Sequence, residues 1–184
     1  MGRTTFSGPV RSRAGFEADI PATMVAGSGI TAGVGTIDVV SVARMGNVIE
    51  TKILMDLTGL SCGGTAADII GVEAAANCHI GQITNAVNGA IFAGYMRCLE
   101  VPAGGNADID LYAANVATGV EDAAVTSLAG QAILVNSGTL SLGTTAVLSA
   151  FPTNGQYLYL ACGTATAATY TAGKLEIVLY GTVA

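Results

Sequence analysis

The chain has 184 residues, of which 51% are hydrophobic and only 11% are charged, against a usual charged share of about 25%. Intrinsic disorder is excluded, because it requires low hydrophobicity together with high charge. The formal net charge of −6 argues against nucleic-acid binding by the body of the protein, since phosphates are held by clustered Lys and Arg. The length suits one all-β domain, or one core with arms.

The N-terminal segment differs from the rest of the chain in charge. Residues 1–16 hold three arginines and no acid, whereas the remainder holds four basic and 13 acidic side chains. Glycines and prolines interrupt this segment, so it cannot bury enough apolar surface to fold by itself. We therefore predict an extended basic arm over residues 1–22, which docks on a partner, and a single domain over residues 23–184; a frayed terminus is the alternative. The arm offers five contact residues: Arg3, Phe6, Arg11, Arg13 and Phe16.

Strand signals follow a glycine-rich segment that begins at Gly27. No Lys follows these glycines as a phosphate-binding loop requires, so we interpret the segment as a flexible crossing into the body. The short apolar run Val39–Val42 comes next, followed by turn residues. From Val48 to Leu57 apolar and polar residues then alternate. This period of two predicts a half-buried strand, with one face made by the alternate positions Ile49, Thr51, Ile53, Met55 and Leu57.

Turn signals divide the remaining chain into further strands. Residues 66–77 are the one candidate for a helix, although Gly71 and β-branched residues argue against it. Asn-Gly pairs predict two hairpins, because a type I′ turn needs positive φ at both central residues. They join 80–87 to 90–99, and 147–151 to 157–162; runs at 131–135 and 174–180 complete a set of eight or more strands. The turn spacing predicts an antiparallel all-β sandwich or jelly roll.

A neutral tract occupies residues 123–173, where 51 consecutive positions carry no charge. Turn residues interrupt it too often for a membrane-spanning helix, which needs about 20 mainly apolar residues, so we expect no membrane partner. The chain opens without the apolar stretch of a secretory signal, and we expect synthesis in the cytoplasm. A neutral, apolar tract is either covered by Thr, Ser and Asn or buried by a partner; we favour an obligate assembly.

The inventory of catalytic and metal-binding residues is small. The single histidine, His79, is next to Cys78, but neighbouring strand positions point to opposite faces, so only a triad assembled through space remains open. Asp108 and Asp110 project to one face, with Glu121 and Asp122 as further acids; calcium or a glycosidase reaction is the alternative to a solvated loop. We predict no enzyme, no cofactor and no metal.

The four cysteines lack the close spacing of zinc sites, and we interpret them as free buried thiols. They are Cys62, Cys78, Cys98 and Cys162.

Several segments resemble the structural proteins of tailed-bacteriophage virions, and in particular the head decoration or cement proteins. Together the similarity spans most of the chain. Four segments carry the resemblance: Arg3–Val10 followed by Ser12, Lys52–Leu60, Gly63–Gly71 and Ala172–Gly181.

The resemblance implies jelly-roll or sandwich subunits, usually trimers, on the outer capsid surface of the virion. Their partner is the major capsid protein, whose neighbouring subunits they clamp after the shell has expanded. The arm would then contact the shell. The arginines of the arm would pair with acidic groups of the shell, and its phenylalanines would fill apolar pockets there.

Three other functions remain open at this stage. A tail or fibre protein would recognise the host surface through a patch of exposed tyrosines. A small β-fold hydrolase would use His79 or the Asp108/Asp110 pair, and a capsid shell subunit would be short at this length. The tyrosines of the first alternative are Tyr95, Tyr112, Tyr157 and Tyr159.

Overall fold

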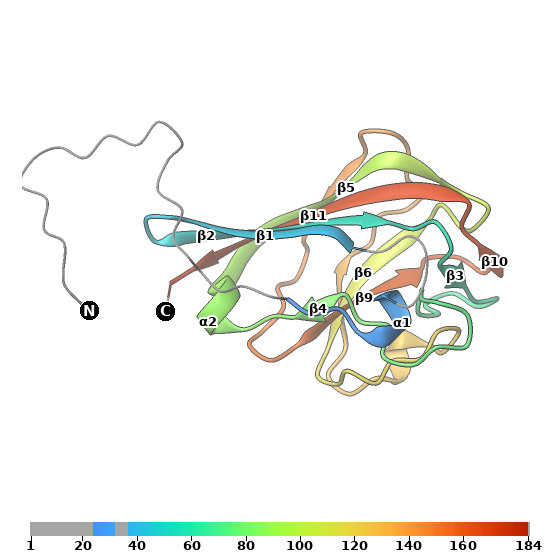
Figure 1. Cartoon of the computed structure of the whole chain (residues 1–184), viewed down its shortest axis with the longest axis horizontal. Coiled ribbons are helices and arrows are strands. Elements are labelled where there is room, and N and C mark those ends of the chain that lie inside the picture. The colour runs from blue at the N-terminus through green and yellow to red at the C-terminus, as the bar shows by residue number, and fades with distance from the viewer. Residues whose placement is uncertain (1–23, 32–36, 184) are drawn as a thin grey trace, which may run out of the picture.

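The chain folds into antiparallel β-sheets, as seen in a computed structural model that describes residues 24–31 and 37–183. Two of the sheets form the upper and lower layers in Figure 1. The predicted arm, with Arg3, Phe6, Arg11, Arg13 and Phe16, lies outside the described residues. The prediction of an all-β, sandwich-like fold is confirmed.

The described residues form eleven strands and three short helices. The five-stranded sheet contains, in spatial order, β1 (Ile37–Met45), β2 (Val48–Asp56), β11 (Ala172–Thr182), β5 (Ala90–Ala103) and β8 (Thr145–Val147). The four-stranded sheet contains β4 (Gly81–Gln82), β9 (Tyr157–Cys162), β6 (Ile109–Ala114) and β7 (Ala132–Val135). A two-stranded sheet pairs β10 (Ala168–Thr169) with β3 (Ser61–Cys62), and the helices are α1 (Ser28–Thr31), α2 (Asn85–Asn88) and the 3₁₀ helix η1 (Val125–Ser127).

The strand pairing is nested along the chain. The innermost antiparallel pair is β6 with β7, and β5 with β8 encloses it. The pair β4 with β9 encloses these in turn, and β2 with β11 is outermost. Successive pairs alternate between the two larger sheets, so the chain winds around one core.

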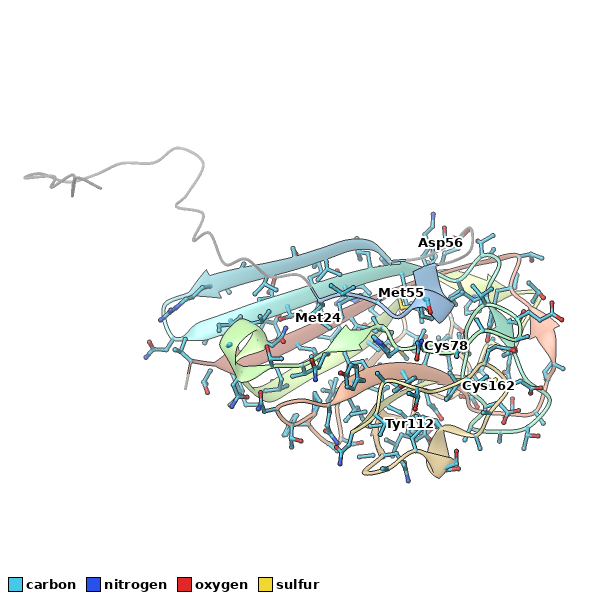
Figure 2. All side chains as sticks on the ribbon, turned by 60° about the horizontal axis from the view of Figure 1, so that its bottom comes forward. Met24, Met55, Asp56, Cys78, Tyr112 and Cys162 are labelled. Carbon is cyan, nitrogen blue, oxygen red and sulfur yellow. The ribbon has the colours of Figure 1, made fainter. Side chains whose placement is uncertain are left out.

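Apolar side chains from both layers fill the space between them. Met24, Met55 and Cys78 lie in this interior, between the two sheets in Figure 2, and each is almost fully buried. Asp56, the neighbour of Met55 on β2, lies on the outer side of its sheet. At roughly 25 cal/mol per Å² of apolar surface, this burial is the main stabilising contribution to the fold.

The alternation predicted for residues 48–57 is confirmed on β2. Burial alternates along the whole strand, with the predicted face inward. The outward residues instead meet water and the polar groups of β11. The turn at Gly46, which has φ +64°, joins β1 to β2 as a hairpin.

The two hairpins predicted at Asn-Gly pairs are wrong. The first pair ends α2, because the Thr84 hydroxyl accepts a hydrogen bond from the Val87 amide (3.3 Å) and starts a helical turn. Gly89 is needed for a close approach, since a Cβ there would lie 2.5 Å from the Thr182 carbonyl oxygen. The second pair forms a turn with φ +91° at Gly155, but that turn connects β8 in one sheet to β9 in the other.

The doubt about a helix at residues 66–77 is confirmed: Asp68 and Ile69 make isolated β-bridges, and left-handed backbone at Ala67, Ala74 and Asn77 breaks the segment into turns. The expectation that this segment is the one helix candidate is wrong, because α1 and α2 lie outside it. The glycine-rich segment, predicted as a flexible crossing, leads from Gly27 into α1.

Ile30 of α1 is fully buried in the core. A Cβ on Gly27 would lie 1.8 Å from the Asn77 carbonyl oxygen, so this glycine is required by packing.

Candidate functional site

Ten large hydrophobic side chains are exposed among the described residues, and six of them lie along one edge of the five-stranded sheet. They come from β5, from β8 and from the turns on either side of β8. We call this surface the β8 ridge; its members are Phe92, Leu99, Val101, Leu142, Val147 and Phe151.

Backbone pairing holds the parts of the β8 ridge together. β8 pairs with the middle of β5, so that Val147 is opposite Tyr95. The turn before β8 returns to the same strand, because the Gly143 amide donates to the Cys98 carbonyl (2.9 Å), and this places Leu142 beside β5. The ridge therefore follows β5 for on the order of 30 Å, at about 3.3 Å per residue.

The exposed area of the β8 ridge is comparable to the largest apolar patch of an ordinary monomer. Leu142 and Val147 are each 73% exposed, and Phe151 lines a hollow of about 270 Å³ together with Ile91. The six residues are 41–73% exposed. With about 150–250 Å² for an aromatic side chain and somewhat less for Leu and Val, together they expose on the order of 500 Å². Patches of about 300–600 Å² are the largest on ordinary monomers and are often functional.

The outer face of the five-stranded sheet carries a network of charges. Glu176 is 7% exposed and forms ion pairs with Lys52 (3.0 Å) and Arg97 (3.7 Å). The Tyr95 hydroxyl donates to the same carboxylate (3.4 Å), and the Arg97 guanidinium lies 5.1 Å from the Tyr95 ring centre. The hydrogen bond to Glu176 and its charge raise the pKa of Lys52.

The two remaining basic side chains of the described residues are also engaged. Lys174 pairs with Asp56 (3.6 Å) and Glu100 (3.9 Å), while the Arg44 Nε donates to the Gly46 carbonyl (2.9 Å). Three of the four Lys and Arg side chains of the described residues are therefore paired with carboxylates, while Arg44 bonds a backbone carbonyl.

His79 lies in the wall of a pocket of about 420 Å³, which Met24, Gln82 and Tyr157 also line. Its ring meets Tyr157 edge-on, with 4.8 Å between centres, and its buried Nδ1 has no hydrogen-bond partner among the described residues. Burial lowers the pKa of His79, and burial raises that of Cys78 to about 11. The Cys78 thiol is therefore protonated at neutral pH, and its Sγ donates to the Ala75 carbonyl (3.3 Å). The two neighbours do not form a nucleophile and base.

The acidic residues that the sequence offered as candidate ligands or catalytic groups fall into two separate groups. Asp108 and Asp110 lie near one another, but Asp110 is buried and accepts a hydrogen bond from the Ser137 amide (3.0 Å). Glu121 lies instead beside Glu73, and it accepts from the Ala74 amide (3.0 Å). Within the described ranges, no group of three or more His, Cys, Asp and Glu side chains is placed to hold a metal ion.

All four cysteines are free and buried, which confirms the sequence interpretation. The Cys62 Sγ donates to the Thr166 carbonyl (2.9 Å). The pKa of Cys62 is lowered, chiefly by a hydrogen bond with Cys162. The same contact, together with burial, raises the pKa of Cys162. These thiols connect β3, β9 and the segment before β10.

The tyrosine patch that a host-recognition protein would use is contradicted by the structure. Tyr159 is fully buried and donates its hydroxyl to the Val116 carbonyl (2.7 Å), and Tyr112 is 8% exposed. Tyr95 lies on the other sheet, away from Tyr157 in the His79 pocket. Alternation along a strand cannot tell which of two apolar faces is inward, so the sequence did not reveal this.

The sequence indicated a neutral, partner-covered tract, but it did not locate the β8 ridge. The exposure of the ridge residues follows from the pairing of β8 with β5 at the edge of the sheet, which depends on residues distant in the sequence.

No family model, no curated protein and no solved structure matches the chain. No helix in the described part of the chain has the length and apolar character needed to cross a membrane.

Proposed function

We propose that this protein is a structural component of a tailed-bacteriophage virion, a decoration or cement protein on the outside of the expanded head. Its partner there is the major capsid protein, and it acts by binding rather than by catalysis. The nested strand pairing is the observation that carries the proposal.

The nested pairing supports a jelly-roll topology for the β body. Eight strands, β2, β4 to β9 and β11, form four antiparallel pairs enclosed one within another, divided equally between the two larger sheets. This is the arrangement expected of a double-sheet jelly roll, a fold used by viral capsid proteins and lectins. Fold alone does not define function, so the charge distribution and the sequence resemblance are needed beside it.

The charge distribution supports docking through the arm. Each basic side chain of the described body is already engaged with a carboxylate or a backbone carbonyl. The remaining cationic groups of the chain are Arg3, Arg11 and Arg13. A partner with an acidic surface would therefore meet these arginines, which form charge-assisted hydrogen bonds with carboxylates.

The action proposed is mechanical. A protein that binds the expanded shell, and not its precursor, stabilises the expanded state by mass action. Trimeric subunits that each contact neighbouring shell subunits would resist the outward pressure of the packed genome.

The test is the copy number of the chain in purified particles of the phage that encodes it, measured by quantitative mass spectrometry against the major shell protein. A simple ratio to the shell protein, with hundreds of copies per particle, is expected. A few dozen copies would assign the protein to the tail or its fibres. Complete absence from particles would overturn any virion role.

A truncation tests the arm separately. Removing residues 1–16 deletes all three arm arginines and both arm phenylalanines, while the described body starts at Met24. We expect the truncated protein to fold and to melt like the full chain, but to occupy stripped heads poorly in a pelleting assay. Unchanged occupancy would show that the arm is not the docking element.

A further inference from the structure

We infer that the β8 ridge is the contact through which a second copy of this chain packs, ridge against ridge, around a closed rotation axis. The inference names a further partner within the proposed function, on which its biological setting rests. Its physical basis is the ridge itself, which is present whether or not the protein decorates a capsid.

The area of the ridge matches what one stable interface needs. A standard protein interface buries about 800 Å² on each partner, and roughly 56–65% of that area is apolar. An apolar contribution of about 450–520 Å² per subunit is therefore required, and the six ridge side chains expose on the order of 500 Å². The ridge therefore has enough apolar area for one interface of standard size.

The chemistry of the ridge favours a copy of itself over a charged partner. Three of its members, Leu142, Val147 and Phe151, lie inside the neutral tract at residues 123–173. Interfaces between identical subunits are richer in apolar area and poorer in charge than transient ones. The docking role proposed for the basic arm uses a different part of the chain.

The position of β8 in the sheet agrees with this assignment. β8 is the last strand of its sheet and has only three residues, so it offers few backbone hydrogen bonds to an added strand. Association is therefore expected to depend on side-chain packing. The other exposed large hydrophobics, which include Val25, Met45 and Val120, do not lie on β5 or β8 and form no second ridge of this kind.

The experiment compares matched charge substitutions in the purified full-length chain, without capsids. Val147 is 73% exposed on the ridge and Val25 is 68% exposed away from it, so Val147→Asp and Val25→Asp place the same new group at similar exposure. Leu142→Asp combined with Val147→Asp gives the stronger ridge variant. Light scattering after size exclusion reports the mass of each protein relative to the 18.3 kDa monomer.

Wild type and Val25→Asp are expected at two or three times the monomer mass, and the double ridge variant at the monomer mass. The dissociation constant should rise by roughly 100-fold or more, because the interface would bury carboxylates without partners. Circular dichroism checks that the ridge variants fold, which is expected because both sites are exposed. Hydrogen exchange at Thr145–Val147 in the wild type should slow as protein concentration rises.

A monomeric wild type, or an oligomer that the double ridge variant leaves intact, would overturn the inference. Either result would leave the capsid proposal standing, because a monomer can still decorate a shell. Conversely, a ridge-dependent oligomer that is absent from virions would remove the capsid proposal and keep the interface.

Discussion

Removing the hydroxyl of Thr51 tests whether a buried polar contact fixes one end of the fold. Thr51 on β2 and Asn88 of α2 are both fully buried, and the Asn88 amide nitrogen donates to the Thr51 Oγ1 (3.0 Å). The Asn88 side-chain oxygen in turn accepts from the Thr84 amide (2.9 Å). Thr51→Val keeps the shape of the side chain but removes the acceptor, so the Asn88 amide loses this partner.

The expected loss follows from the cost of an unsatisfied buried group. Leaving a buried donor without its partner costs about 1–3 kcal/mol, and the substitution creates little cavity because its volume hardly changes. For a chain of 150–250 residues, each kcal/mol lowers Tm by about 2–4 °C, so Tm should fall by roughly 2–12 °C. Asn88→Ala should cost more, because it also leaves the Thr84 amide unpaired and opens a cavity.

Urea unfolding of the four proteins in a double-mutant cycle is the assay. We expect a coupling energy between Thr51 and Asn88 of about 0.5–3 kcal/mol, as for residues in direct contact. Thr182→Val is the control, since Thr182 is an exposed strand threonine and its change should stay within about 0.5 kcal/mol. A Thr51→Val protein as stable as the control, or additive single changes, would refute the assignment of this contact.

Two further predictions concern titratable groups. Burial is the largest influence on the pKa of Glu121 and of Asp110, and both are raised, so between the folded and unfolded pKa values the native state binds more protons. The contribution of these two groups to the free energy of unfolding should therefore rise as the pH falls from neutral toward the ordinary carboxyl range. Glu121→Gln should reduce this rise in urea titrations at several pH values, and an unchanged slope would contradict it. All four thiols are buried, so a disulfide reagent should label native protein far more slowly than urea-unfolded protein; rapid native labelling would argue against their burial.

The sequence predicted best where a single face of a strand meets the core. On β2, alternation fixes the inward residues, because a slip of one residue would expose the whole apolar face to water. Turn spacing likewise sufficed for the all-β fold class, and the wide spacing of the cysteines for their interpretation as free buried thiols. These features depend on local pattern and on the hydrophobic effect, which a single sequence records.

The hairpin predictions failed because an Asn-Gly pair can end a helical turn or connect two sheets as well as join two paired strands. Asn88-Gly89 contains residues suited to a tight hairpin, but a cap from Thr84 and the buried contact with Thr51 place Asn88 in a helical turn. Asn154-Gly155 does turn, yet it carries the chain from one sheet to the other. Such outcomes depend on contacts between residues distant in the sequence, so turn propensity alone cannot distinguish them.

The neutral tract at residues 123–173 lacks charges for two different structural reasons. In the sequence, residues 123–173 form one neutral tract, whereas the nested strand pairing divides them between the two larger sheets. β9 lies in the four-stranded sheet, and Leu158–Cys162 are fully buried there, so this part lacks charges because a charge would disrupt the core. β8 lies at the outer edge, where Val147 is 73% exposed and folding alone does not require an apolar residue. A carboxylate introduced at Leu158 should therefore prevent folding, whereas one at Val147 should affect only assembly.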